Sequence, residues 1–246
     1  MGKADIHIHT THSDGMATVA QVLDFVEYET DLDMIAITDH DMFDGADEAR
    51  NLAARRNYRF QILTGMEITT LEGHLLVLGI DKPVRSLQGL DRTIAQVHEQ
   101  GGIVIAPHPL SWLIRSIGHN GLLRIHNNPS DVVHFDGYET LNPSLAGRVV
   151  AEQARALNTH VLQLAETGGS DSHVLETVGT AATVFPGKTA DDFRRALADK
   201  ATTVEGHYWS REEMQYLARI GPAQMFQSLV KLPAKHVRRA VKTVRR

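Results

Sequence analysis

Short apolar runs typical of β-strands alternate along the chain with longer segments in which apolar residues recur at helical spacing. The strand-like runs are residues 4–9, 34–38, 61–68, 74–80, 103–106, 135–140 and 160–165, with a shorter one near 202–204. The helix-like segments are residues 18–31, 44–57, 87–100, 112–123, 144–157 and 190–198. Thr18 is placed to cap the first helix, and Gly101 and Gly102 to end the third. The alternation predicts a parallel sheet with helices packed against it.

About seven such units in one domain favour an α/β fold in which the sheet closes into a barrel or a distorted barrel. The chain has 246 residues, 42% of them hydrophobic, which is enough for one large core. No repeat, low-complexity linker or change of composition interrupts the pattern before about residue 205. We therefore expect a barrel domain over residues 1–205 and a helical extension over 206–246.

Charge is distributed unevenly along the chain. The net charge is -5 with neutral histidines, but the last sixteen residues hold seven Lys or Arg and no acid, so the remainder carries -12. An acidic body suits a protein that concentrates cations. The basic C-terminal tail is expected either to contact nucleic acid or an anionic surface, or to be a solvated terminal helix.

Several structural classes are disfavoured by composition. The chain has no cysteine, which excludes disulfides and thiolate metal sites. The N-terminal residues lack the apolar stretch of a signal peptide, and no apolar run approaches the roughly 18 residues that a membrane-spanning helix needs. The sequence therefore predicts a cytoplasmic protein that is not inserted in a membrane.

Fourteen histidines are present, and many of them gather with carboxylates where predicted strands end. His7 and His9 are two residues apart on the first strand, so their side chains point to the same face. Two imidazoles on one face of a barrel interior are costly unless something binds them, and a metal ion is their natural partner. Other residues of ligand type follow later strands at the C-terminal end, which is the active-site face of an α/β barrel. They are His12, Asp39, His40, Glu67, His108, Asp171 and His173, with His74 at the start of the fourth strand.

In these motifs the sequence resembles the PHP family (polymerase and histidinol phosphatase). The motifs are Asp-Ile-His7-Ile-His9, His12-Ser-Asp14-Gly, Thr-Asp39-His40-Asp, Gly-Met-Glu67-Ile, Gly-His74-Leu, Ala-Pro-His108-Pro and Ser-Asp171-Ser-His173, in the family's order across about residues 4–205. The resemblance implies a distorted (β/α)7 TIM-like barrel and a trinuclear metal centre. It implies that His7, His9, Glu67 and Asp171 bind the first metal. Glu67 would bridge to a second metal held also by His74 and His108, and His12, His40 and His173 would bind the third.

The implied centre points to hydrolysis of a phosphoester. A water between two cations bridged by Glu67 would have its pKa lowered toward ~7 and would attack phosphorus in line, while the third metal would offset charge on the phosphate. Catalytic roles are accordingly expected for Glu67, Asp171, His173, Asp14 and Asp39. The cofactors expected are two to three divalent ions of zinc, manganese or iron, among which nitrogen and oxygen ligands do not choose.

Supporting roles are open at several positions. Asp39 is expected either to orient a neighbouring imidazole or to cap the end of its strand. Asp14 is expected either to act near the third metal or to start a turn with Gly15. Arg115 and His119, on the loop after the fifth strand, and Arg148, near the start of a later helix, are candidates for binding the substrate phosphate. Glu139 and Asn142 are expected to line the pocket or to cap the next helix.

Three functions are compatible with these residues. The first is hydrolysis of a small phosphomonoester, of nucleotide or sugar type, or of a short oligonucleotide, with inorganic phosphate as product and histidinol phosphate as an alternative substrate. The second is an amidohydrolase, which also begins with His-x-His but usually bridges its metals with a modified lysine; no lysine lies between Lys3 and Lys82. The third is a non-catalytic metal-binding module, which the complete ligand set disfavours.

Overall fold

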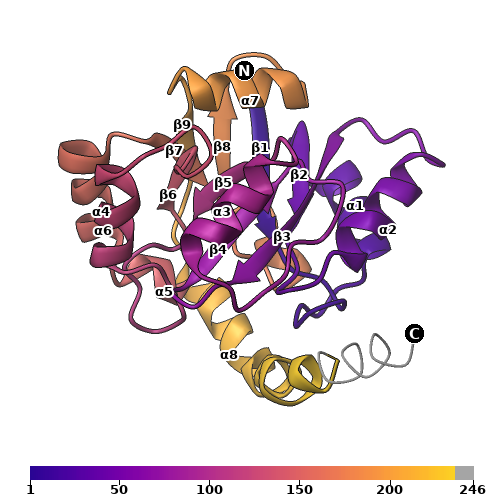
Figure 1. Cartoon of the computed structure of the whole chain (residues 1–246). Helices are drawn as coiled ribbons and strands as arrows, with labels where there is room; N and C mark the ends of the chain where they lie inside the picture. The colour runs from indigo at the N-terminus through magenta and orange to yellow at the C-terminus, as the bar shows by residue number, and fades with distance from the viewer. Residues whose placement is uncertain (236–246) are drawn as a thin grey trace, which may run out of the picture.

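A nine-stranded sheet curls into a nearly closed barrel in the computed structural model, which describes residues 1–235 (Figure 1). Its strands are β1 (Gly2–Ile8), β2 (Met34–Ile37), β3 (Gln61–Thr69), β4 (His74–Leu78), β5 (Ile103–Ala106), β6 (Gly137–Leu141), β7 (Ala165–Gly168), β8 (Ala181–Phe185) and β9 (Thr203–Gly206), in the order β7-β6-β5-β4-β3-β2-β1-β8-β9. Side-chain hydrogen bonds join the two ends of the sheet. Thr183 Oγ1 donates to the Gly168 carbonyl at 3.0 Å, and Thr202 Oγ1 donates to the Glu166 carbonyl at 2.7 Å. The predicted distorted α/β barrel is confirmed.

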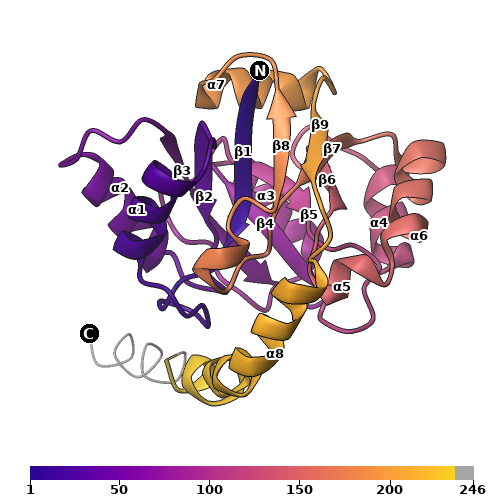
Figure 2. The ribbon, with the colours of Figure 1, turned by 180° about the vertical axis from the view of Figure 1, so that it is seen from behind.

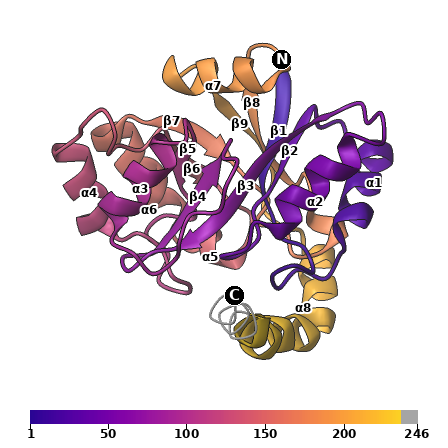
Figure 3. The ribbon, with the colours of Figure 1, turned by 45° about the vertical axis from the view of Figure 1, so that its right-hand side comes forward.

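Helices surround the barrel and close one of its ends. They are α1 (Val19–Glu29), α2 (Asp44–Ala53), α3 (Leu90–His98), α4 (His119–Asn127), α5 (Leu145–Arg148), α6 (Ala151–Leu157), α7 (Ala190–Ala198) and α8 (Arg211–Phe226), the last followed by a π-helical turn, Gln227–Lys231. Helices α1 and α2 flank β1 to β3, and α3, α4 and α6 flank β4 to β6 (Figures 1 and 2). In all three views α7 and α8 lie at opposite ends of the barrel (Figure 3).

Apolar side chains fill the barrel interior. Ile6, Leu76 and Ile105 pack there from three different strands. Phe193 of α7 joins the same cluster and meets Phe185 edge-on, with ring centroids 5.3 Å apart. Because α7 plugs the end at which β1 begins, the opposite end of the barrel is left for polar side chains.

The sheet is mixed, so the prediction that it is wholly parallel is wrong. Strands β1, β2 and β3 are parallel, as are β5, β6 and β7, but β4 is antiparallel to both of its neighbours, and β8 and β9 are antiparallel additions. Residues 70–73 join β3 to β4, and so short a connection forces a hairpin instead of a crossover. As a result His74, the first residue of β4, lies at the same end of the barrel as the last residues of the parallel strands.

Some predicted element boundaries are also wrong. The apolar run expected as a strand at 160–165 continues α6 as a π-helical turn, Asn158–Leu162, because Leu157 and Leu162 are buried together. Gln163 then takes a left-handed φ of 49°, and β7 begins at Ala165. The expected helix at 112–123 is α4, shifted to His119–Asn127, and the helix expected at 144–157 is broken at Val150 into α5 and α6. The pattern did not predict β8, whose two alanines give a weak strand signal.

Two predicted helix ends are confirmed. Thr18 caps α1 in a reciprocal capping box with Gln21, and Gly101 takes a left-handed φ of 70° after α3. In the part of the chain that the structure describes, no helix combines the length and apolar character needed to cross a membrane. The basic residues from Arg238 onward lie outside the described residues.

Candidate metal centre

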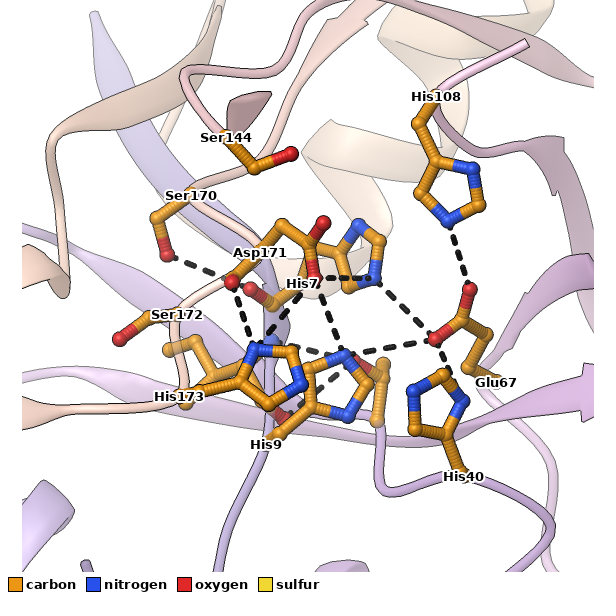
Figure 4. A network of polar contacts seen from close by, with 12 residues as sticks. His7, His9, His40, Glu67, His108, Ser144, Ser170, Asp171, Ser172 and His173 are labelled. Atoms are coloured by element: carbon orange, nitrogen blue, oxygen red, sulfur yellow. Dashed lines mark hydrogen bonds and ion pairs between the residues drawn. The ribbon is translucent and has the colours of Figure 1, made fainter. Parts of the chain in front are cut away.

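Six histidines and three carboxylates converge at the end of the barrel opposite α7. They come from segments far apart in the sequence and are His7, His9, Asp14, His40, Glu67, His74, His108, Asp171 and His173. Figure 4 labels most of them, namely His7, His9, His40, Glu67, His108, Asp171 and His173. A bulge in the pairing of β1 with β2, between Asp5 and Ile8, lets Ile6 pack in the interior while His7 and His9 reach this end. The backbone is strained at two ligand-type residues, since His108 and Asp171 have positive φ values of 29° and 52°.

The first group surrounds one point between four side chains. His7 Nε2 lies 3.5 Å from Glu67 Oε2 and 3.5 Å from Asp171 Oδ1. His9 Nε2 lies 3.4 Å from each of the same two oxygens. Tetrahedral coordination with bonds of about 2.0–2.2 Å separates neighbouring ligand atoms by roughly 3.3–3.6 Å. Each of the two imidazole nitrogens therefore lies at the spacing of neighbouring metal ligands from both carboxylate oxygens.

The second group gathers at the other oxygen of the same glutamate. Glu67 Oε1 lies 3.0 Å from His74 Nδ1 and 2.9 Å from His108 Nε2. Glu67 Oε2, which faces His7 and His9, also lies 3.0 Å from His40 Nδ1. The two oxygens of one carboxylate thus face different sets of imidazoles, which is the arrangement of a bridging ligand.

The third group contains Asp14 where the sequence led us to expect His12. Asp14 Oδ1 lies 3.4 Å from His173 Nε2 and 4.0 Å from His40 Nε2, and His9 stacks on both of these rings. His12 Nε2 instead lies 2.6 Å from Glu48 and belongs to none of the three groups. The His12 side chain thus lies apart from the three groups, and its expected role as a ligand stays a prediction.

Asp39 explains why the loop presents Asp14 and not His12. Its carboxylate accepts hydrogen bonds from Thr10 N, Thr10 Oγ1 and Ser13 N at 2.7, 2.7 and 3.1 Å, and also from the Ser13 hydroxyl. Asp39 therefore fixes the loop that carries Asp14. These hydrogen bonds join it to the loop and not to an imidazole, so its expected role in orienting an imidazole stays a prediction.

Unpaired buried atoms gather at the centre. Within residues 1–235, eleven buried side-chain polar atoms lack a hydrogen-bond partner, and six of them are His7 Nε2, both ring nitrogens of His9, Asp14 Oδ1, Glu67 Oε2 and His74 Nδ1. Several lie within ion-pair distance of a carboxylate yet have no hydrogen-bond geometry. Buried polar atoms are rarely left without partners, and shared cations would satisfy these. The residues present fit divalent ions that take nitrogen and oxygen ligands.

The pKa values of the histidines in the centre also indicate a place for cations. Burial opposes protonation of His40, but Glu67 and Asp14 outweigh it and raise the pKa of His40 to about 10. Burial is likewise outweighed at His173, where Asp14 raises the pKa to about 9. Burial, together with the neighbouring His173 and His40, lowers the pKa of His9 to about 4. The carboxylates thus raise the pKa of two of these rings, and bound divalent ions would take the place of protons on the ligating nitrogens.

Glu139 contacts two of these histidines in a way that was not predicted from the sequence. Its Oε1 lies 3.0 Å from His7 Nδ1, and its Oε2 accepts hydrogen bonds from the His108 backbone N–H at 2.6 Å and from Asn142 Nδ2 at 2.9 Å. A carboxylate on the second ring nitrogen is the usual way in which a metal-binding histidine is oriented. The available signal was a glutamate inside an apolar strand, because a buried carboxylate needs partners of this kind.

A pocket of about 390 Å³ opens onto the centre, with apolar walls formed by Ile114, Leu145, Trp209 and Leu217. The three residues expected to bind the substrate phosphate are not among its lining residues. Arg115 donates from Nη2 to the Thr70 carbonyl at 3.2 Å, and Arg148 lies 5.7 Å from the centre of the Tyr208 ring. His119 is exposed at the start of α4. These three expectations are not supported by the placement of the side chains.

The segment after β9 forms one wall of the pocket. Trp209 and Leu217 line it, and Trp209 Nε1 is buried without a partner. Ser228 Oγ donates to Asp14 Oδ2 at 2.7 Å, and Lys235 Nζ donates to the Ser13 carbonyl at 2.7 Å. The extension therefore contacts the loop that supplies a ligand-type residue.

Comparison with known proteins agrees with this geometry. The family model described as PHP domain matches residues 5–176, and the model described as PHP-associated matches residues 153–202. An uncharacterised protein of Methanocaldococcus jannaschii is 31% identical over 127 residues, which are 47% of this chain and 72% of that protein. A 3′,5′-nucleoside bisphosphate phosphatase of Chromobacterium violaceum is 38% identical over 85 residues, but these cover only 33% of this chain and 29% of that enzyme.

A solved structure shares the fold. It is that of a two-domain protein of Bacteroides vulgatus containing a predicted PHP-like metal-dependent phosphoesterase, with a TM-score of 0.66 at 19% identity. The match covers 83% of this chain and 64% of that one.

Proposed function

Since the chain belongs to the PHP domain family, we propose that it is a metal-dependent phosphoesterase that uses two to three divalent ions of zinc, manganese or iron. The observation that carries the proposal is the position of Glu67, whose Oε1 faces His74 and His108 while its Oε2 faces His7, His9 and His40. His7, His9, Glu67 and Asp171 would hold one ion, and Glu67, His74 and His108 a second. Asp14, His40 and His173 would hold a third.

Each group of residues has a separate task in the proposed reaction. When bound, the ions would lower the pKa of a water molecule and neutralise charge on the phosphate. Glu139 keeps the Nδ1 side of His7 engaged, so that its Nε2 faces the centre. Asp39 fixes the Thr10–Ser13 loop behind Asp14. The pocket walls exclude water from the reacting phosphate.

We further propose a nucleotide-sized phosphomonoester as substrate, with inorganic phosphate as product. A volume of about 390 Å³ suits a small ligand. Trp209 and Leu217 offer an apolar surface to a base, and the unpaired Trp209 Nε1 offers it a hydrogen-bond donor. No Lys or Arg is among the described residues that line the pocket, so the phosphate would be neutralised by the metal ions. The phosphatase of Chromobacterium violaceum makes nucleoside bisphosphates the first substrates to assay. A cytoplasmic location belongs to the same proposal.

A substrate panel tests the proposal. The full chain is stripped of metal with a chelator, reloaded with manganese, zinc or iron, and assayed on nucleoside monophosphates and bisphosphates, sugar phosphates, histidinol phosphate, short oligonucleotides, amides and lactones. We expect phosphate release from small phosphomonoesters in at least one metal form. The variant His9→Asn should lose this activity and the exposed control His160→Asn should keep it. Turnover of amides or lactones alone would favour an amidohydrolase, and turnover of nothing in the panel would favour a non-catalytic module.

A further inference from the structure

A second group of side chains with metal-binding chemistry lies at the other end of the barrel. His98 is the last residue of α3, and His134 and Asp136 precede β6. Asp136 Oδ2 accepts a hydrogen bond from the Val104 backbone N–H, near the start of β5, at 2.7 Å. His108 of the first centre follows the opposite end of the same strand. The two groups share no residue.

The three side chains converge on one point. His98 Nε2 lies 2.9 Å from Asp136 Oδ2, and His134 Nε2 lies 3.4 Å from Asp136 Oδ1. The two imidazole rings are stacked, with centroids 4.3 Å apart and planes inclined by 22°. All three ligand atoms lie within 4.8 Å of one another. The two nitrogen–oxygen distances, 2.9 and 3.4 Å, are close to the roughly 3.3 Å between neighbouring ligands in a tetrahedral zinc site.

The backbone fixes which nitrogen of each ring is available. His98 Nδ1 donates to the Val132 carbonyl at 3.1 Å, and His134 Nδ1 donates to the Ser130 carbonyl at 3.1 Å. A carbonyl only accepts, so Nδ1 carries the hydrogen in both rings. In the neutral ring the lone pair then sits on Nε2. Backbone carbonyls on the far nitrogen are the usual second partners of metal-binding histidines.

Both Nε2 atoms face Asp136, and the His98 contact has hydrogen-bond geometry, so either a proton on that ring or a cation shared with His134 must lie between nitrogen and carboxylate. Asp136 helps to raise the pKa of His98, although burial of the ring opposes this. Protonation of both rings, however, would place two positive charges on stacked imidazoles 4.3 Å apart, with a single carboxylate to compensate them. One dication shared by two neutral imidazoles and Asp136 satisfies all three groups. The exposed fractions of the side chains, 9% for His98, 26% for Asp136 and 38% for His134, leave a route for the ion and for water ligands.

We propose that His98, His134 and Asp136 form a separate mononuclear site for a transition-metal dication of the zinc class. Two imidazoles and one carboxylate supply three ligands, and water completes the coordination. The site ties the end of α3 to the segment that enters β6. Mutual backbone hydrogen bonds between Ser130 and Val133 hold the turn that carries His134, so the ligands are positioned before the ion binds. The role is structural, because the pocket lies at the other end of the barrel.

Zinc stoichiometry tests the proposal with the full chain. The metal-free protein is titrated with Zn²⁺, and the bound metal is counted after removal of the excess. We expect His134→Ala and Asp136→Ala each to bind one equivalent less than the wild type, while the exposed control His160→Ala binds the same number. Phosphoester turnover, where it is present, should remain unchanged in His134→Ala. Equal zinc counts in the wild type and both site variants would overturn the proposal.

A measurement on the unmutated protein covers the case in which a variant does not fold. Ring ¹⁵N resonances of His98 and His134 are followed at pH 8 as Zn²⁺ is added. We expect the Nε2 signals of both rings to shift together at one equivalent, with Nδ1 remaining protonated. Nε2 signals that do not respond to zinc would show a proton-bridged cluster, and the metal assignment would be wrong.

Discussion

The substitution Glu139→Gln isolates the contribution of a residue that contacts two ligand-type histidines without belonging to the metal centre. Glu139 is 2% exposed and engages His7 Nδ1 at 3.0 Å and the His108 backbone N–H at 2.6 Å. Glutamine has the same size, but it is neutral and has only one acceptor oxygen. The variant therefore keeps one of these contacts and loses the charge-assisted character of both.

The expected magnitude follows from the contact that is lost. A hydrogen bond to a charged group contributes about 1.5–3 kcal/mol. At 1.36 kcal/mol per tenfold change, this corresponds to roughly 10- to 150-fold in metal affinity. This range overlaps the loss of metal affinity, roughly 10- to 100-fold, that typically follows removal of a hydrogen-bond partner of a metal-binding histidine. We expect the metal dissociation constant of Glu139→Gln to rise by about 10- to 100-fold, and excess metal to restore most of the turnover.

The assay is competition with a chromophoric chelator, followed by turnover of an aryl phosphate at several metal concentrations. The control is Glu166→Gln, since Glu166 is half-buried near the start of β7, away from the residues that line the pocket. Metal affinity within twofold of the wild type in Glu139→Gln would refute the reasoning. So would an equal loss in the control.

Three further predictions follow from other parts of the chain. Asp14→Ala should lose one equivalent of metal, whereas His12→Ala should keep the full number, because only Asp14 faces the third group; the reverse result would restore the expectation from sequence. Trp209→Ala should raise KM for a nucleotide about 5-fold or more with little change in kcat, since base–aromatic stacking contributes roughly 1–3 kcal/mol; an unchanged KM would exclude a stacking role. Backbone N–H groups at the start of α7 hold the pKa of Asp192 below its usual value, so its stabilising effect is present above about pH 4 and disappears as the pH falls further. The Tm of the wild type should therefore fall more between pH 6 and pH 3 than that of Asp192→Ala, and parallel curves would contradict this.

The barrel could be predicted because its strands and helices differ clearly in apolar period. The direction of each strand was harder to predict from the sequence. His74 stands at the start of its strand, and on a parallel sheet that position would lie at the wrong end of the barrel. The four-residue connection before it makes a hairpin and brings His74 beside Glu67. Apolar runs also do not separate a strand from a buried helical turn, and for this reason the residues around Leu162 were misplaced.

The candidate site could be predicted as a set of residue types, but not in its orientation. His12 and Asp14 are two residues apart on a loop, where no regular period tells which side chain faces inward. Four hydrogen bonds to Asp39 decide in favour of Asp14, and they join segments almost thirty residues apart. The pairing of Glu139 with His7 spans 132 residues and depends on how the barrel closes. Arg115 was chosen for its charge, but its side chain is held by the Thr70 carbonyl.

The coupling of metal content to turnover through Glu67 is the most direct test of the proposed function. Metal-free wild type and Glu67→Gln are titrated with the metal that the substrate panel selects, and phosphate release is measured at each equivalent bound. We predict no turnover without metal and a rise in the wild type as the second equivalent binds. In Glu67→Gln we predict a loss of turnover of at least about 1,000-fold at every metal level, since one oxygen of the bridge becomes a neutral amide. Such a loss corresponds to an activation free energy that is higher by roughly 4 kcal/mol. Turnover by the metal-free protein, or near wild-type turnover by Glu67→Gln, would contradict the proposed metal-dependent function.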